Sequence, residues 1–115
     1  MERIVLLGTQ VRCSFADPTQ AEVEFTWRIV DSALRGVPQR LELSFLAHDF
    51  SSSAGGILVP LEAGVERHLY RGRLASQTRY HWRISTAAAG PERWEPSGIA
   101  SFDAPSCAIG DRVEG

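Results

Sequence analysis

The sequence contains no lysine, no asparagine, only two cysteines and a single methionine, Met1. Two cysteines are too few for a disulfide-rich scaffold, and Cys13 and Cys107 do not have the spacing of paired metal ligands. A blue-copper centre is excluded because its methionine ligand and Cys–His spacing are missing. All twelve basic residues are arginine, which we attribute to codon bias; the alternative is selection for bidentate recognition of carboxylates or phosphates.

Long apolar runs are also absent from this chain. The run near the N-terminus, residues 4–7, is too short for the core of a signal peptide or for a membrane span. We therefore expect no membrane insertion. The location is expected to be cytoplasmic if Met1 is the native start, and extracellular if the chain is an excised domain. The formal net charge of −2 argues against nucleic acid as a partner.

A chain of 115 residues with 43% hydrophobic and 23% charged residues is typical of one folded domain. Hydrophobic residues recur at every second position between turn-forming residues, which predicts short antiparallel strands and no helix of useful length. We expect strands over residues 3–15, 21–30, 41–49, 57–61, 65–74, 79–87 and 98–104. The domain is expected to span residues 1–105, and residues 106–115 to form a tail.

The alternation also assigns side chains to the two faces of each strand. The residues expected to face the core are Val23, Phe25, Trp27, Ile29, Leu41, Leu43, Phe45, Ala47, Tyr80, Trp82 and Ile84. Gly8 is expected to form a bulge, and Pro60 suits the edge of a sheet. On the outward faces, Glu22 and Glu24 are expected to pair with arginines of a neighbouring strand, Arg67, Arg71 and Arg73.

The stretch from Leu74 to Phe102 is the most specific part of the sequence. Leu74, Thr78 and Tyr80 lie at a predicted corner between two strands. In immunoglobulin-like sandwiches a tyrosine in this place bonds through its hydroxyl to backbone a few residues upstream. We expect the same bond from Tyr80, which would fix the corner between the sheets.

With Trp27 on the second strand and this corner, the chain resembles a fibronectin type III domain. The run from Tyr80 to Ile84, followed by Trp94, Ser97 and Phe102, is similar to bacterial members of that family. The resemblance implies an all-β, seven-stranded, antiparallel immunoglobulin-like sandwich, with three strands in one sheet and four in the other. It also implies a non-catalytic adhesion, receptor, spacer or accessory role, although a fold by itself is weak evidence of function.

No catalytic motif is present: there is no nucleophile elbow, phosphate loop or His-Glu-x-x-His sequence. We read His48-Asp49 followed by three serines as a polar loop, and we expect no enzymatic activity and no cofactor. His48 and His81 are expected to point outward near each other. Two imidazoles are fewer than the three or four ligands of a firm zinc site, so we predict no metal centre.

The two cysteines lie toward opposite ends of the chain, and Cys107 falls in the expected tail. Cys13 ends the first strand and Cys107 follows the last, and in this kind of sandwich both reach the same pole. A disulfide between them is one alternative, and two free thiols in a reducing compartment are the other.

The predicted binding surface is the pole where the loops after strands two and six meet, because loops vary without disturbing the core. Its candidate residues are Leu34, Arg35, Arg93, Trp94 and Glu95. Arginine and tryptophan are favoured at the energetic centres of interfaces. The alternative for Trp94 is that it folds back on the sheet. A secondary surface is expected at Phe50, His81 and Arg83.

These observations predict a non-catalytic module for protein–protein interaction, or an accessory subunit, whose partner is another protein. Contact would be made by the loops or by an edge strand. The alternative is a spacer or carbohydrate-associated module of a larger secreted enzyme. A small metal-dependent hydrolase is the third hypothesis.

Overall fold

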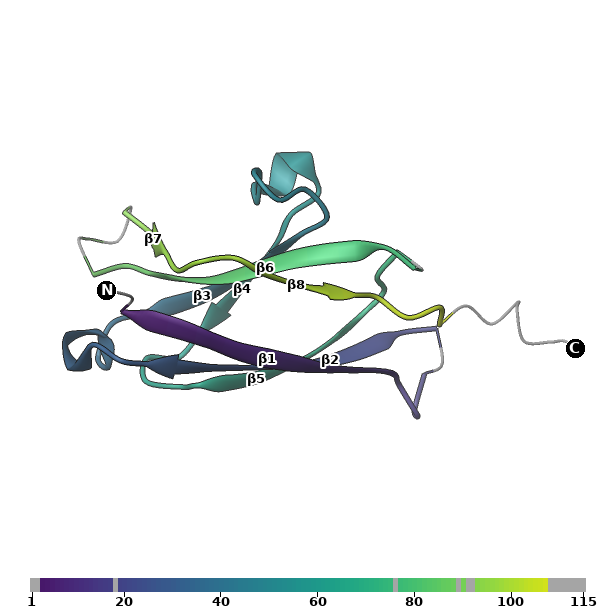
Figure 1. Cartoon of the computed structure of the whole chain (residues 1–115), viewed down its shortest axis with the longest axis horizontal. Helices are drawn as coiled ribbons and strands as arrows, with labels where there is room; N and C mark the ends of the chain where they lie inside the picture. Colours follow the sequence, from purple (N-terminus) through teal and green to yellow (C-terminus); the bar gives the residue numbers. More distant parts are fainter. Residues whose placement is uncertain (1–2, 18, 76, 89, 91–92, 108–115) are drawn as a thin grey trace, which may run out of the picture.

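The structure, a computed structural model, describes residues 3–17, 19–75, 77–88, 90 and 93–107. The chain folds into two antiparallel sheets that lie face to face (Figure 1). The first has the order β1–β2–β5, with bounds Ile4–Cys13, Ala21–Ile29 and Arg67–Gly72. None of the helical segments in the described part of the chain has the length and hydropathy needed to cross a membrane.

The second sheet has five strands, in the order β4–β3–β6–β7, with β8 also paired to β6. Their bounds are β3 (Gln39–Ser44), β4 (Ile57–Leu61), β6 (Arg79–Thr86), β7 (Glu95–Pro96) and β8 (Ala100–Asp103). Two short 3-10 turns, η1 (Ser32–Leu34) and η2 (Ser52–Ala54), lie in the connections. The predicted all-β antiparallel sandwich is thus confirmed.

Seven strands were expected, and the described residues form eight, because a short strand, β7, lies in residues that were expected to form the loop before the last strand. Ser97 lies between this strand and β8. Its backbone N–H donates to the Ile84 carbonyl at 2.8 Å, and its hydroxyl accepts the Ile84 N–H at 3.0 Å. The serine hydroxyl therefore takes the place of the backbone carbonyl that would have continued the ladder. The Ile84 N–H is hydrogen-bonded although no continuous strand lies beside it.

Strand β3 ends earlier than expected, at Ser44 rather than near residue 49. The Ser44 hydroxyl accepts the Leu46 N–H and donates to the Asp49 carbonyl, both at 2.9 Å. This local bonding turns the chain away from the sheet. Phe45 and Ala47, which were expected in the core, are consequently exposed.

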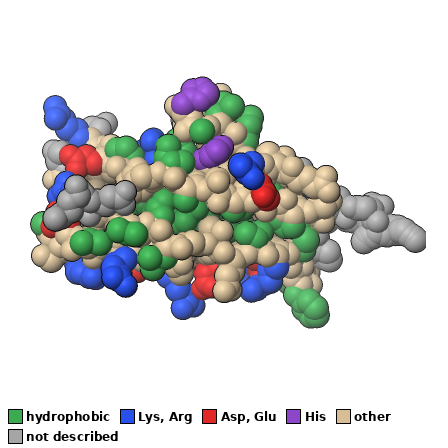
Figure 2. Space-filling model, in the orientation of Figure 1, with side chains coloured by type: hydrophobic (Ala, Val, Ile, Leu, Met, Phe, Trp, Pro, Cys, Tyr) green, Lys and Arg blue, Asp and Glu red, His purple; other side chains and the backbone are tan. Residues whose placement is uncertain are grey.

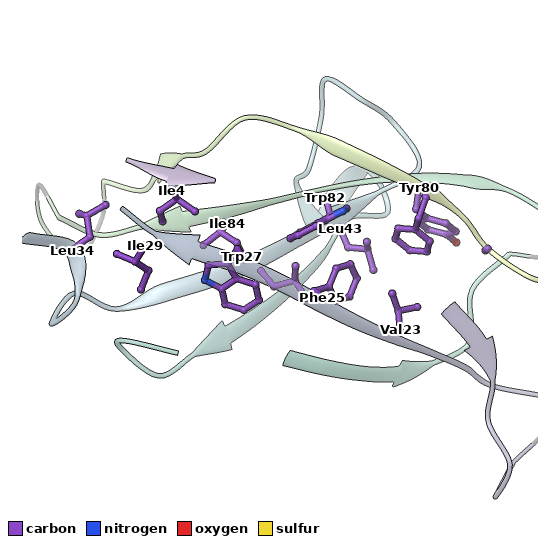
Figure 3. Packing of buried hydrophobic residues seen from close by; sticks show 13 residues of the cluster. Ile4, Val23, Phe25, Trp27, Ile29, Leu34, Leu43, Tyr80, Trp82 and Ile84 are labelled. Atoms are coloured by element: carbon purple, nitrogen blue, oxygen red, sulfur yellow. The ribbon is translucent and has the colours of Figure 1, made fainter. Parts of the chain in front are cut away.

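The core lies between the sheets and is built mainly from alternate residues of β2, β3 and β6 (Figure 3). Its aromatic centre joins the two layers. The ring centroids of Phe25 and Trp82 are 4.8 Å apart, and those of Phe25 and Phe102 are 5.7 Å apart. The predicted inward positions on β2 and β6 are confirmed: Val23, Phe25, Trp27, Ile29, Tyr80, Trp82 and Ile84 are buried.

One buried polar side chain, Gln39, organises an end of this core. Its amide oxygen accepts the indole N–H of Trp27 at 3.2 Å, and its amide nitrogen donates to the carbonyls of Glu62 and Val65 at 3.1 and 2.8 Å. The Trp27 indole and the Gln39 amide are both buried and would otherwise lack partners, which is costly. Gln39 therefore ties the second sheet to Trp27 of the first and to the turn before β5.

The outward face of the first sheet carries the expected ion pairs. Arg67 lies 2.8 Å from Glu24, and Glu22 accepts hydrogen bonds from both Arg12 and Arg71. Arg73 lies beyond the end of β5 and takes no part in these pairs. Gly8 forms the predicted bulge, because the register of β1 against β2 shifts between Leu6 and Gly8.

Cys13 and Cys107 form a disulfide, with their Cα atoms 5.5 Å apart, so the free-thiol alternative is wrong. The bond joins the end of β1 to the segment after β8. Cys107, which was assigned to a tail, is buried and attached to the sandwich. The rest of that expected tail, residues 108–115, lies outside the described residues.

Tyr80 makes the predicted bond to upstream backbone, since its hydroxyl accepts the N–H of Ala75 at 2.9 Å. Tyr80→Phe is expected to lower the free energy of unfolding by about 1 kcal/mol, because it removes one hydrogen bond and keeps the ring in place. Urea denaturation of the two proteins measures the difference. Tyr70→Phe is the matched control, and an equal loss in that variant would argue against a special role for the Tyr80 hydroxyl.

Candidate functional site

The outer face of the second sheet carries a buried glutamate held between two arginines. Glu42 on β3 lies directly opposite Arg83 on β6, and Arg40, two residues earlier, points to the same side. Arg83 Nε lies 2.6 Å from Glu42 Oε1, and Arg40 Nε lies 2.8 Å from Oε2. The Glu42 side chain is only 2% exposed, so both of its oxygens are paired with little contact to water.

The charge state of Glu42 follows from two opposing effects. Burial raises the pKa of its carboxyl, whereas the hydrogen bonds from Arg83 and Arg40 lower it. The arginines prevail, and the pKa lies below the ordinary value of 4.5. Glu42 is therefore ionised at neutral pH, and the three side chains together carry one net positive charge.

Each arginine of this group also stacks on an aromatic ring. The guanidinium carbon of Arg40 lies 4.4 Å from the centroid of the Trp94 ring, and that of Arg83 lies 4.2 Å from the centroid of Phe50. We call these five residues the arginine–aromatic row. A cation over an aromatic face adds about 0.5–2 kcal/mol of attraction, so the row fixes the positions of Trp94 and Phe50.

Phe50 anchors the connection between β3 and β4, residues 45–56, which stands away from the sandwich (Figure 1). The Asp49 carboxylate accepts the N–H and the hydroxyl of Ser51, at 3.0 and 2.6 Å. These bonds hold the pKa of Asp49 below its usual value. At Gly56 a Cβ atom would lie 2.2 Å from the Phe50 carbonyl oxygen, so only glycine allows this close return of the backbone. The connection is thus held in one shape.

Apolar side chains are exposed at both ends of this connection. Phe45 is 48% exposed and Leu58 is 37% exposed, and His48 lies exposed between them in sequence. Figure 2 shows hydrophobic and histidine side chains together on the part of the molecule that projects at the top. We call Phe45, His48 and Leu58 the loop face. His48 and Leu58, but not Phe45, line a hollow beside this connection; its other lining residues are Arg40, Glu42, Asp49, Phe50, Ser51, Ser52 and Arg83.

Two of the residues predicted to lie at a binding surface are instead buried. Leu34 is 2% exposed, because the Asp31 carboxylate accepts the Ala33 N–H and starts a 3-10 turn that directs Leu34 into the core. Phe50 is 4% exposed, because it packs beneath Arg83. Both predictions of a surface position are wrong for the same reason: a single apolar side chain in a polar loop packs into the protein and holds the loop against it.

The charged residues of the predicted pole are mostly occupied by partners. Arg35 donates to the Ile29 carbonyl at 3.1 Å and lies 3.5 Å from Glu66. Glu95 lies 3.0 Å from Arg3, while Arg93 is exposed. Trp94 is half-buried and stacked on Arg40, in line with the alternative that it folds back on the sheet. A pocket of about 250 Å³ at this pole is lined by Arg3, Ile4, Leu34, Thr86, Glu95, Pro96, Ser97 and Gly98.

At the predicted secondary surface, two of the three residues are in contact, because Arg83 stacks on the Phe50 ring. His81 is half-buried on β6, opposite Ser44 of β3 and Ser101 of β8. Over the part of the chain that the structure describes, no three His, Cys, Asp or Glu side chains are close enough together to hold a metal ion.

Sequence reasoning did not identify Arg40 and Glu42, the residues at the centre of the row. Glu42 lies between the inward residues Leu41 and Leu43, which signals an outward and therefore solvated position. Its burial depends on Arg83, forty-one residues away, being directly opposite it. Only the pairing register of β3 with β6 reveals that contact.

Comparisons with known proteins support the fold alone. No model of a known protein family and no curated protein matches this sequence. Among solved structures, the chain is similar to a β-sandwich protein described as a computer-based redesign, with a TM-score of 0.53 and 18% identity. That match covers 88% of this chain and 94% of the other. The arrangement of two packed sheets is therefore one that a known β-sandwich shares.

Proposed function

We propose that this chain is a non-catalytic protein-interaction module or accessory subunit of fibronectin type III type, and that it binds its protein partner through the loop face. The observation that carries the proposal is a projecting connection held in one shape, with a half-exposed phenylalanine at its start. Support for the family comes from the Tyr80–Ala75 hydrogen bond, buried Trp27 and the order of the strands in both sheets.

The fixed shape of the connection lowers the entropy that is lost when a partner binds. A loop that must become ordered on binding loses conformational entropy, whereas one that is already fixed does not. The Ser44 and Asp49 hydrogen bonds and the buried Phe50 ring fix residues 45–56 before a partner arrives. Burial of the apolar area of Phe45 and Leu58 against a partner would then contribute to affinity with little loss of conformational entropy. A few such contacts, aromatic ones above all, commonly provide most of the binding energy of an interface.

Phe45→Ala is expected to weaken partner binding by about tenfold to a hundredfold, the effect of losing an aromatic anchor. The test compares the proteins captured from the native source by immobilised wild type and by variants. Leu7→Ala, at an exposed apolar position on the other sheet, is the matched control. A partner retained by wild type and Leu7→Ala but lost by Phe45→Ala supports the proposal. Equal retention by all three proteins contradicts it.

A second candidate function has support from the disulfide between Cys13 and Cys107. Because cytosolic thiols are kept reduced, we propose that the chain resides in an oxidising compartment, as a spacer or carbohydrate-associated module of a secreted enzyme would. Retarded migration of the protein in a gel containing a soluble polysaccharide would favour this function. Unchanged migration would leave the interaction module as the better account.

A further inference from the structure

Strand β5 forms one edge of the first sheet, and its backbone lacks the features that interrupt the other edges. β4 contains Pro60, β1 has a bulge at Gly8, and the edge formed by β7 and β8 is interrupted at Ser97. Prolines, bulges and short strands are the usual protections of a sheet edge. β5 runs for six residues without any of them and, within the described part of the chain, pairs only with β2.

The direction of the β5 backbone groups follows from one hydrogen bond. Trp27 N–H donates to the Glu66 carbonyl at 3.0 Å, which directs the backbone of Glu66 toward β2. Because the backbone groups of a strand alternate in direction, His68 and Tyr70 also face β2. The N–H and C=O groups of Arg67, Leu69 and Arg71 point to the open side, where an added strand would meet them.

The side chains beside this open ladder have a definite pattern. On the outward face of β5, Arg67, Leu69 and Arg71 are exposed by 73%, 41% and 57%. The three strands of this sheet contain four arginines and two glutamates. Arg67 pairs with Glu24, and Arg71 shares Glu22 with Arg12, so the sheet keeps an excess of two positive charges in a chain whose formal net charge is −2. Figure 2 shows basic side chains, with acidic ones between them, along the lower side of the molecule, where Figure 1 places β5.

We propose that the β5 edge accepts an extended acidic peptide strand, with acidic side chains opposite Arg67 and Arg71 and an apolar one opposite Leu69. Backbone hydrogen bonds would supply affinity, and the alternating side chains would supply specificity. A second copy of this chain is disfavoured as the occupant. Antiparallel pairing of two β5 strands about Leu69 would place Arg67 of each copy opposite Arg71 of the other, and directly opposed like charges destabilise a sheet.

The test is fluorescence anisotropy with the full chain and a labelled heptapeptide, threonine-rich, with glutamate, valine and glutamate at alternate positions. Wild type is expected to bind it at least about tenfold more tightly than the same peptide with lysines in place of glutamates. Leu69→Pro removes an open-side N–H without breaking a bond to β2, and is expected to weaken binding by about tenfold or more. Equal binding of the two peptides, or undiminished binding by Leu69→Pro, would overturn the proposal.

A second pair of variants keeps the backbone unchanged and tests the charges. Arg67→Gln combined with Arg71→Gln is expected to remove the preference for glutamate, whereas Arg79→Gln, at an exposed ion pair on the other sheet, is expected to keep it. An unchanged preference for glutamate in the double variant would overturn the proposal. A wild-type dimer that dissociates on Leu69→Pro would also overturn it, because the occupant of the β5 edge would then be a second copy of the chain.

This inference rests on the proposed function in one respect, that the chain is a protein-binding module. Phe45→Ala separates the two, since it is expected to bind the acidic peptide as wild type does. If the peptide fails to bind but partner capture still depends on Phe45, only the β5 proposal fails. If the peptide binds but capture does not depend on Phe45, only the loop face is wrong.

Discussion

Reduction of the Cys13–Cys107 disulfide is expected to lower the free energy of unfolding by about 4 kcal/mol. The bond joins residues 94 positions apart and so restricts nearly the whole unfolded chain. Losing that restriction favours the unfolded state far more than losing any one surface contact. Urea denaturation with and without a reductant measures the effect.

The double variant Cys13→Ser, Cys107→Ser is the control for this prediction. Without reductant it is expected to match the reduced wild type, and reductant is expected to leave it unchanged. A loss below about 1 kcal/mol on reduction would mean that the end of β1 and the segment after β8 are held together by other contacts.

Glu42→Ala is expected to have the next largest effect, a loss of about 3 kcal/mol in the free energy of unfolding. The substitution leaves Arg40 and Arg83 without their shared carboxylate, and both side chains are only about a quarter exposed. Unpaired charges in such places are costly. We also expect the connection anchored by Phe50 to loosen, because Arg83 stacks on that ring.

Chemical denaturation of Glu42→Ala and of Glu24→Ala tests this prediction. Glu24 also pairs with an arginine, Arg67, but at a more exposed position, so its loss is expected to cost below about 1 kcal/mol. Faster hydrogen exchange at residues 45–56 in Glu42→Ala alone would show that the row supports the connection. Similar losses in the two variants would contradict the assignment of Glu42 as a buried anchor.

The contribution of Glu42 should also depend on pH, with a sign fixed by its lowered pKa. A carboxyl whose folded pKa lies below its unfolded value stabilises the fold above the unfolded value, here 4.5, and loses this effect as the pH falls through the folded pKa. The stability difference between wild type and Glu42→Gln is therefore expected to shrink between pH 7 and pH 3. A difference that stays constant over this range would contradict the paired, ionised state.

Local pattern was sufficient for most of the fold, because burial on β2 and β6 follows the alternation at every position except Glu22 and Ser85, which are buried as well. Val23, Phe25 and Trp27 are all buried as the period of two predicts. The ion pairs of Glu22 and Glu24 with arginines of β5 were likewise predictable, because they require only that two strands with opposite charges lie side by side. The bond from Tyr80 was predictable because its corner has a sequence signature.

The connections were predicted less well, because their shapes depend on individual side chains rather than on a period. Ser44 ends β3 through its hydroxyl, and nothing in the alternation of the preceding residues indicates that. Leu34 and Phe50 have polar neighbours in the sequence, but both are buried. A 3-10 turn directs Leu34 into the core, and Phe50 packs beneath Arg83. The row around Glu42 required the register of two strands far apart in the chain.

The most direct test of the loop face is a hydrogen-exchange footprint of the chain with its captured partner bound. Backbone amides in residues 45–58 are expected to gain protection in the complex, while those at the predicted pole, residues 31–36 and 93–95, are expected not to change. Protection confined to that pole, with residues 45–58 exchanging as in the free protein, would contradict the loop face as the binding surface.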